Sequence, residues 1–272
     1  MKTLVDKVAV VTGAAMGMGR ILSGMLVAEG CRVALVDVAE DALAGAEQEL
    51  AAKGAAKAYV CDIRDRKAVY DLAARIRDDM GPVSLLVNNA GIMRAAPLLE
   101  LSDDAVDAMI GVNLTAQFWC AKAFIPQMLE AGAGHVVNVS SAGGLLAIPN
   151  LSAYCASKFG VVGFTDALRQ EAKRLKWPVT VTCVCPNTVN TGMFDGARMV
   201  TGTRMLDPES VCREMLRGIK KDKPYIGVPH MAVNVLTPLT KALLPTGAMD
   251  QFNRVLGMWS ANDDTHGRAD SR

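Results

Sequence analysis

The sequence lacks a strong charge of either sign and has no long hydrophobic run. Lysine and arginine number 29 against 28 acidic residues, so the net charge is +1. Proteins that bind nucleic acid usually carry a basic excess, and we therefore expect no nucleic-acid partner. No run of about 18 apolar residues occurs, which predicts the absence of a transmembrane segment. The first residues also lack the pattern of a secretory signal, so we expect a cytoplasmic protein.

Histidine is scarce, and the cysteines do not suggest pairing. His135, His230 and His266 do not stand at metal-ligand spacing from one another or from a cysteine. We therefore expect no metal site, and a zinc-dependent alcohol dehydrogenase mechanism is disfavoured. The seven cysteines are odd in number and scattered. This pattern is typical of buried thiols in a reducing compartment.

Apolar, β-branched runs alternate with helical patterns along most of the chain. The expected strands are residues 8–12, 31–36, 56–60, 83–88, 135–140, 180–185 and 225–228. The expected helices are residues 18–29, 41–53, 66–80, 103–130, 152–175 and one that begins at Asp207-Pro208-Glu209. This order predicts an α/β protein with a single-domain Rossmann fold, in which a doubly wound, parallel, seven-stranded sheet carries helices on both faces.

The domain is expected to cover residues 1–260, with a loop at about 187–207 and a C-terminal segment at 229–260. Within that segment, residues 231–244 are apolar but contain Pro238 and are too short to span a bilayer. We expect them to pack against the domain or another subunit. Residues 261–272 are polar, and we expect them to form a disordered tail.

A glycine-rich turn, Thr12-Gly13-Ala14-Ala15-Met16-Gly17-Met18-Gly19, follows the first strand. Its three glycines would let backbone N–H groups approach a pyrophosphate at the start of a helix. The phosphate-binding loop of nucleotide hydrolases is one alternative, but Arg20-Ile21 stands where that loop needs Lys-Ser/Thr. A glycine-rich turn without a ligand is the other alternative.

Acidic residues end the next two strands. Asp37 lies 18 residues beyond Gly19, where a carboxylate would bind the adenosine ribose. It would repel a 2′-phosphate, and residues 38–41 contain no basic side chain to bind one, so NAD is favoured over NADP. A simple helix cap is the alternative. Asp62 would meet the adenine, or would serve only as a turn residue.

Further polar residues give weaker signals. Asn88-Asn89-Ala90-Gly91 ends a strand with small and amide residues that suit a backbone lying against the ribose. Asn113 interrupts an apolar helix, where an amide often bends the helix or binds water. Tyr154 and Lys158 share one helical face, a spacing that is common by chance. An ammonium group there would lower the pKa of the phenol.

Together these motifs resemble the short-chain dehydrogenase/reductase family over roughly residues 5–230. The motifs that carry the resemblance are Thr12-Gly13-xxx-Gly17-x-Gly19, Asn88-Asn89-Ala90-Gly91, Asn113, Ser141 and Tyr154-xxx-Lys158. The thirteen-residue step from Ser141 to Tyr154 selects Ser141 over Ser140. Residues 185–194 are similar to the branch of the family that acts on retinoids and 17β-hydroxysteroids.

The resemblance implies catalytic roles and cofactor contacts. Tyr154 would exchange the proton, while Lys158 would bind the ribose and lower the pKa of the phenol. Ser141 would hold the substrate oxygen, and Asn113 would support a water of the proton relay. The implied contacts to NAD, besides Tyr154 and Lys158, are Gly13, Gly17, Met18, Gly19, Asp37, Asp62, Ile63, Asn89, Ala90, Gly91, Pro186, Val189 and Thr191. Pro186-Asn187 replaces the usual Pro-Gly, and asparagine best replaces glycine at positive φ.

The activity that the resemblance implies is hydride transfer between NAD and an alcohol or ketone. The loops beyond the strand ends are apolar, so we expect this substrate to be hydrophobic. The expected substrate walls are Met93, Leu145, Leu146, Ile148, Leu151, Met193, Phe194 and Met199. These methionines could equally fill gaps in the core, which is their commoner use. An NADPH-linked carbonyl or 3-oxoacyl reductase and a non-catalytic NAD-binding module are the alternatives. Family members commonly form dimers or tetramers through the helices that hold Asn113 and Tyr154, so a homodimer or homotetramer is expected.

Overall fold

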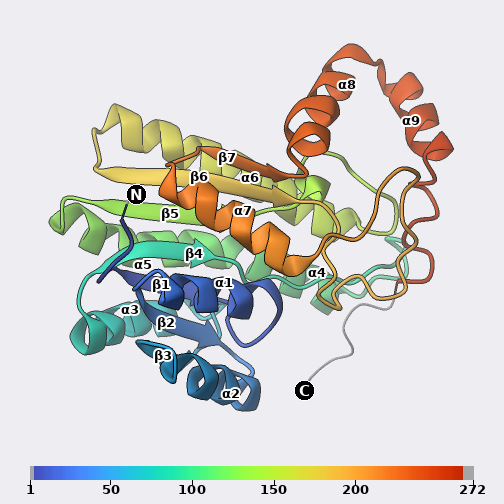
Figure 1. The fold of residues 1–272 in the computed structure, drawn as a ribbon. Coiled ribbons are helices and arrows are strands. Elements are labelled where there is room, and N and C mark those ends of the chain that lie inside the picture. The colour runs from blue at the N-terminus through green and yellow to red at the C-terminus, as the bar shows by residue number, and fades with distance from the viewer. Residues whose placement is uncertain (1–2, 266–272) are drawn as a thin grey trace.

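Seven parallel strands form the centre of the molecule in the computed structural model, which describes residues 3–265 (Figure 1). The strands are β1 (Val8–Thr12), β2 (Arg32–Asp37), β3 (Ala56–Val60), β4 (Val83–Asn88), β5 (Gly134–Val139), β6 (Val179–Pro186) and β7 (Tyr225–Val228). Their order is β3-β2-β1-β4-β5-β6-β7. The order reverses between β1 and β4, and ligands of open α/β sheets bind beyond the strand ends at such a switch point.

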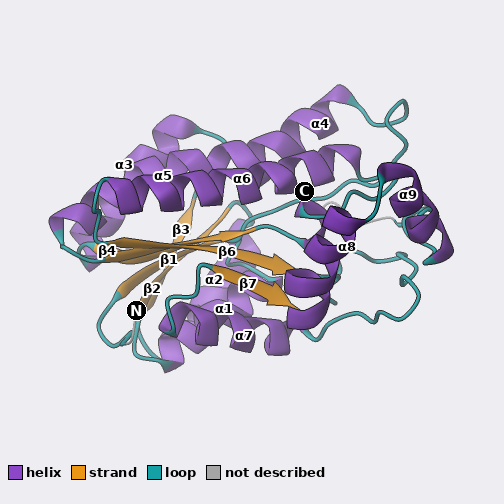
Figure 2. Cartoon of the chain, turned by 90° about the horizontal axis from the view of Figure 1, so that it is seen from above, coloured by secondary structure: helices purple, strands orange, loops and turns teal. Residues whose placement is uncertain are grey.

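Helices cover both faces of the sheet, which confirms the predicted doubly wound Rossmann fold (Figure 2). Helices α3 to α6 lie on one face, and α1, α2 and α7 lie on the other. The main helices are α1 (Gly17–Ala28), α2 (Glu40–Ala51), α3 (Arg66–Met80), α4 (Asp103–Ile110), α5 (Ala116–Glu130), α6 (Ser152–Arg174), α7 (Pro208–Lys220), α8 (Thr237–Leu243) and α9 (Thr246–Val255). In the described part of the chain, no helix is both long and apolar enough to cross a membrane.

Two hydrophobic cores lie on opposite sides of the sheet. Val10, Leu86 and Phe124 belong to the core beneath α3, α5 and α6. Val11 and Leu35 belong to the core beneath α1, α2 and α7. Because both faces are covered, the central strands read as continuous apolar runs instead of alternating ones. Because the strands are packed on both sides, the positions of their ends are fixed. The loops that begin at the carboxyl edge are therefore held at fixed starting points.

The helix expected over residues 103–130 is interrupted. The Ser102 hydroxyl accepts from the N–H of Ala105 at 3.3 Å and caps α4. A π-helical turn, η1 (Gly111–Thr115), then separates α4 from α5. Such turns occur where a residue must be placed out of the regular helical register. Here that residue is Asn113, which is fully buried.

The prediction of a disordered tail from residue 261 is wrong for its first five residues. The Ala261 carbonyl accepts from the N–H of Arg198 at 2.8 Å. The guanidinium of Arg198 pairs with Asp264 at 2.5 Å, and the Asn150 amide donates to Asp263 at 3.1 Å. These bonds to two other loops offset the entropy lost on ordering polar residues. Residues 266–272 lie outside the described part of the structure.

Candidate active site

The glycine-rich turn between β1 and α1 is tightly packed. Gly13 and Gly17 have φ values of 68° and 55°, a left-handed conformation that glycine adopts without strain. A Cβ atom on Gly19 would lie 1.9 Å from the Gly13 carbonyl oxygen. The hydroxyl of Thr12 accepts from the N–H groups of Asn89 and Ala90 at 3.0 and 3.1 Å. These contacts join the turn to the end of β4 at the switch point.

The N-terminus of α1 fits the pyrophosphate of a dinucleotide. The side chain of its N-cap residue, Met16, makes no cap hydrogen bond, and the first turn contains no acidic residue. Its N-terminal N–H groups and the helix dipole therefore favour an anion there. Met18, Asn89 and Gly91 also line the pocket that contains Tyr154. The predicted loop thus lies next to the predicted catalytic residues.

Asp37 ends β2 beside the same turn. One carboxylate oxygen accepts from the N–H of Ala15 at 3.0 Å, and the other accepts from Val38 and Ala39 at 2.8 and 3.1 Å. Asp37 therefore holds the turn before α2 but is not the N-cap of that helix, which is Ala39. A carboxylate has about four acceptor positions, so capacity is left for the hydroxyls of a ribose.

Asp62 has a strong local partner. Its carboxylate pairs with the Arg64 guanidinium at 2.7 Å and also accepts from the N–H of Arg64 at 2.9 Å. The hydrogen bonds from Arg64 lower the pKa of Asp62. The neighbouring Ile63 side chain is buried in the core, so only its backbone could face an adenine. The geometry matches a turn aspartate, and contact with adenine stays a prediction.

Three of the predicted catalytic side chains line one pocket at the carboxyl edge. Ser141 follows β5, and Tyr154 and Lys158 lie on α6; all three are at least nine-tenths buried. The Ser141 hydroxyl lies near the Tyr154 phenol and acts to lower its pKa. Ser140 has a different role, since its hydroxyl donates to the Lys158 carbonyl at 2.8 Å. The structure therefore places Ser141, and not Ser140, against the phenol.

Lys158 lies close to Tyr154, and both side chains are buried. The Nζ atom of Lys158 is 5.8 Å from the centroid of the Tyr154 ring and donates to the Val139 carbonyl at 3.0 Å. Burial raises the pKa of Tyr154 to about 12, although the Ser141 hydroxyl acts to lower it. Burial also lowers the pKa of Lys158 to about 8. Burial disfavours the charged form of each group and so opposes the predicted lowering of the phenol pKa by Lys158, which stays a prediction.

Asn113 lies just behind this pocket. Its amide exchanges two hydrogen bonds with the backbone of Ile92, at 2.8 and 2.9 Å, and donates to the Ser157 hydroxyl at 3.0 Å. A Cβ on Gly91 would be 3.4 Å from both the Asn113 oxygen and Lys158 Nζ. Asn113 therefore holds the loop after β4 against α6. Its role with a proton-relay water stays a prediction.

Sequence reasoning missed Gln117 and Ser157. The buried Gln117 amide donates to the backbone carbonyl of Asn113 at 2.9 Å, and Ser157 accepts from the Asn113 side chain. The signal for Gln117 was available, because two amides four residues apart on a helix are a known stabilising pair. Ser157 gave no separate signal, since serine inside a helix usually bonds only its own backbone.

The interpretation of Asn187 is wrong. Among the described residues, the non-glycine residues with positive φ are Asp6, Asn150, Lys176 and Asp222, and Asn187 is not one of them. Its side-chain oxygen instead accepts from the N–H of Thr188 at 2.9 Å. Asparagine is thus used here for a local hydrogen bond, which turns the chain without a left-handed residue.

The active-site pocket has an apolar side formed by the loop after β6. Phe194 meets the Tyr154 ring edge-on, with centroids 6.2 Å apart and planes at 88°. The residues that line this pocket are Met18, Asn89, Gly91, Val139, Ser140, Ser141, Tyr154, Lys158, Pro186, Asn187, Val189, Thr191, Met193 and Phe194. The predicted cofactor positions Pro186, Val189 and Thr191 are therefore brought to Tyr154. The predicted position Ala90 lies behind them, half-buried against the core.

The predicted substrate walls divide into several groups. Met193 and Phe194 line the active-site pocket. Met93 and Leu151 are 3% and 2% exposed and belong to the core, as the gap-filling alternative held for the methionine. Leu145 packs against the core near β6. Leu146 and Met199 are half-buried in their loops.

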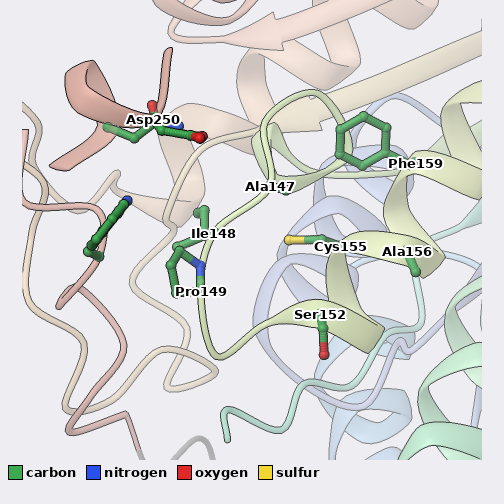
Figure 3. Close-up of a pocket in the computed structure, with 10 residues that line it drawn as sticks. Ala147, Ile148, Pro149, Ser152, Cys155, Ala156, Phe159 and Asp250 are labelled. Carbon is green, nitrogen blue, oxygen red and sulfur yellow. The ribbon is translucent and has the colours of Figure 1, made fainter. Parts of the chain in front are cut away.

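Ile148 lines a second cavity, of about 600 Å³, on another side of α6 (Figure 3). Its walls come from the loop at 147–149, from the first turns of α6 and from the C-terminal segment. The residues that line it are Ala147, Ile148, Pro149, Ser152, Cys155, Ala156, Phe159, Asp250, Asn253 and Trp259. The buried Asn253 side-chain oxygen has no hydrogen-bond partner among the described residues.

Known proteins of one family match this chain. The family model described as short chain dehydrogenase matches residues 7–199. Epidermal retinol dehydrogenase 2 of Mus musculus is 35% identical over 249 residues, covering 90% of this chain and 80% of that protein. Estradiol 17-beta-dehydrogenase 11 of Mus musculus is also 35% identical, over 246 residues, covering 88% of this chain and 80% of that protein.

Solved structures agree with these relatives. A short chain dehydrogenase/reductase from Burkholderia phymatum in complex with NAD has a TM-score of 0.82 at 29% identity, over 89% of this chain and 95% of that one. A metagenomic short-chain oxidoreductase in complex with NADP has a TM-score of 0.70 at 30% identity, over 82% and 95% of the two chains. The chain therefore belongs to the short-chain dehydrogenase/reductase family, and within it is similar to the retinol and 17β-hydroxysteroid dehydrogenases.

Proposed function

We propose that this protein is an NAD-dependent dehydrogenase that transfers a hydride between the nicotinamide and a hydrophobic alcohol or ketone. The observation that carries the proposal is that Tyr154, Ser141 and Lys158 line one pocket, together with the apolar Phe194 and with Met18 of the glycine-rich turn. The names of the relatives support the same substrate class, since they include retinol and estradiol dehydrogenases.

Each residue has a defined part in the proposed reaction. In the oxidative direction Tyr154 takes the alcohol proton, the carbinol C–H bond breaks with its electron pair, and a carbonyl forms. The nicotinamide of a bound NAD would supply the acceptor for that hydride in this direction, and the hydride donor in the reverse direction. Ser141 holds the substrate oxygen, whose charge changes during the reaction. Lys158 would hold the ribose of the bound cofactor.

Asp37 favours NAD over the alternative of an NADPH-linked carbonyl or 3-oxoacyl reductase. Its carboxylate lies against the glycine-rich turn, and the following residues 38–41 carry no basic side chain. A 2′-phosphate placed there would be repelled by the Asp37 carboxylate and would find no basic side chain at residues 38–41 to bind it. A non-catalytic NAD-binding module is supported less well, because such a protein has no need of Ser141 and Tyr154 in one pocket.

Replacing Asp37 tests the cofactor assignment. In Asp37→Ala we expect the ratio of kcat/KM for NAD+ to kcat/KM for NADP+ to fall by about 10- to 100-fold, the effect of losing one or two charged hydrogen bonds. Both values of kcat/KM are measured on the same variant, so their ratio cancels any general loss of stability caused by the missing Asp37 hydrogen bonds. Asp41→Ala, on the exposed first turn of α2, is the matched control and should leave the ratio unchanged. A wild-type protein that prefers NADP+ would refute the assignment.

The pH dependence of turnover follows from the buried phenol. Because burial raises the pKa of Tyr154 to about 12, the phenolate fraction should grow tenfold for each pH unit below that value. Alcohol oxidation needs the phenolate, so kcat should rise with a slope near one on a logarithmic plot between about pH 7 and pH 9. Ketone reduction needs the protonated phenol and should not rise. A flat profile for oxidation would contradict a proton transfer to Tyr154.

The substrate class is tested by a screen of NADH formation. Retinoids, steroids, aryl alcohols and long-chain alcohols are incubated with the protein and NAD+, and formation of NADH is followed by absorbance. We expect turnover with at least one apolar class, and no turnover with any of them would refute the proposed activity.

We also propose a homodimer or homotetramer formed through α5 and α6. The exposed Phe118 lies there, and its ring centroid is 3.9 Å from that of Phe164.

A further inference from the structure

The cavity that Ile148 lines is separate from the active-site pocket, although both border α6 (Figure 3). Tyr154 and Lys158 of this helix line the active-site pocket, whereas Cys155 and Phe159 line the cavity. Successive residues of a helix are rotated by about 100°, so the two pairs lie on different faces of α6. Among the described residues, none lines both spaces. A molecule in the cavity would therefore not occupy the active-site pocket.

The size and the walls of the cavity match those of a small-molecule site. Its volume is about 600 Å³, and pockets for small molecules range over about 300–1,000 Å³. Ile148 and Pro149 form one wall, and the rings of Phe159 and Trp259 form others. Such sites are mostly apolar and hold a few polar groups that orient the ligand. The polar groups of this cavity therefore indicate which ligand it would take.

Two side chains of α9 bring oxygen acceptors to the cavity. Asp250 and Asn253 both line it and stand three residues apart, which places them on one face of the helix. The side-chain oxygen of Asn253 is buried and has no hydrogen-bond partner among residues 3–265. An unpaired buried acceptor destabilises a fold, and such groups are rare. A hydrogen-bond donor on a ligand would satisfy this oxygen.

Two cations already lie over the aromatic walls. The Lys241 ammonium is 4.5 Å from the centroid of the Phe159 ring, and the Arg254 guanidinium is 5.6 Å from that of Trp259. Lys241 also donates to the Leu145 carbonyl at 2.9 Å, so its apolar segment packs against the domain, as expected from the sequence. A cationic ligand would be repelled by these two charges at the rings that would otherwise attract it.

A negatively charged ligand is disfavoured for a different reason. Carboxylate oxygens only accept hydrogen bonds, so such a ligand would leave the Asn253 oxygen unpaired and would lie beside the Asp250 carboxylate. A hydroxyl group can donate to either oxygen and carries no charge. We propose that the cavity is a second, non-catalytic binding site for a neutral apolar alcohol whose hydroxyl donates to Asn253. This proposal does not depend on the activity proposed above, because no residue of the active-site pocket takes part in it.

Titration of the full chain with 1-octanol, octanoate and octylammonium, without NAD, tests the proposal. The three probes share one apolar chain and differ in the charge of the head group. Trp259 lines the cavity, whereas Trp119 and Trp177 pack against the core beneath α3, α5 and α6, so a change in tryptophan fluorescence reports occupancy. We expect saturable binding of 1-octanol, binding of the two charged probes that is at least about tenfold weaker, and no signal in Trp259→Phe.

Asn253→Leu separates binding from folding. Leucine has nearly the shape of asparagine but no acceptor, so we expect the melting temperature to rise while the affinity for 1-octanol falls by about tenfold, the effect of one hydrogen bond. Asn234→Leu is the matched control. The Asn234 oxygen is also buried without a partner among the described residues, but it lies outside the cavity, so this variant should bind 1-octanol like the wild type.

The proposal is overturned if 1-octanol gives no saturable change in fluorescence, because solvent alone would then satisfy Asn253. It is also overturned if either charged probe binds as tightly as 1-octanol, or if the two leucine variants lose affinity equally. A Trp259 signal that changes with protein concentration, and not with 1-octanol, would identify a second copy of the chain as the occupant and would overturn it too. The screen of NADH formation tests the proposed activity separately from all of these outcomes.

Discussion

Tyr154→Phe is expected to abolish most turnover while leaving NAD affinity nearly intact. General acid–base groups contribute about 10²- to 10⁴-fold to rate, and we expect a loss of kcat in that range. The phenylalanine ring keeps the contact with Phe194 and the packing of the surrounding core, so the fold should not change. The change removes one hydroxyl, which lies in the same pocket as that of Ser141. The measurement is NADH formation alongside NAD binding by calorimetry.

Tyr70→Phe is the matched control for that variant. Tyr70 lies on α3 and is 39% exposed, so the same chemical change there should leave kcat and NAD affinity as in the wild type. Turnover by Tyr154→Phe at the wild-type rate would remove Tyr154 from the mechanism. Equal losses of NAD binding and of kcat would instead point to a damaged cofactor site.

Lys158→Met is expected to lower both kcat and NAD affinity. The lysine is 4% exposed and donates to the Val139 carbonyl at the end of β5. Methionine has a similar length and no charge, so it should fill the same space. We expect a rise of about 10-fold in KM for NAD+, the cost of a charged hydrogen bond to the ribose, and a loss of about 100-fold in kcat.

The split between the two constants distinguishes the roles of Lys158. A change in KM alone would mean that the lysine only binds the cofactor, and a change in kcat alone would mean that it acts only on the proton transfer. Lys173→Met, on the exposed last turn of the same helix, should change neither constant. The pH profile of kcat adds a further check. Burial lowers the pKa of Lys158 to about 8, so a change in kcat near that pH that depends on Lys158 should be absent from Lys158→Met.

Much of the fold could be predicted because its signals are local. The strands are short apolar runs such as Val8–Thr12, bounded by glycine or polar residues, and burial on both faces keeps those runs continuous. The glycine-rich turn was recognisable because it follows such a strand and begins a helix. Its glycines are required by contacts that no side chain would tolerate, as the position of Gly19 shows.

The missed features depend on contacts between distant parts of the chain. The π-helical turn at Gly111–Thr115 is set by bonds from Asn113 to Ile92 and Ser157, which no helical period reveals. Helix α9 was not predicted, although Met249, Phe252 and Val255 recur at a helical spacing, and Met249 is the residue of this helix that is buried. Met93 was interpreted as a substrate wall because its loop lies at the right edge, yet tertiary packing buries it.

The candidate site was predictable in composition but not in electrostatics. The sequence pattern placed an ammonium near a phenol and suggested a lowered pKa. The structure keeps the two groups close but buries both, and burial raises the pKa of Tyr154 while it lowers that of Lys158. Distance along a helix is a local property, whereas desolvation depends on the whole pocket.

Hydrogen bonds between the loop after β6 and the C-terminal segment couple the ordering of the loop to the ordering of that segment. Residues 187–207 form a long connection, and the N–H groups of Arg198 and Thr201 bind the carbonyls of Ala261 and Leu256. These bonds divide the loop into shorter spans and reduce the entropy lost when it closes. A ligand that orders the loop must therefore also stabilise the C-terminal segment. By reciprocity, anything that holds that segment would raise the affinity of the loop for its ligand.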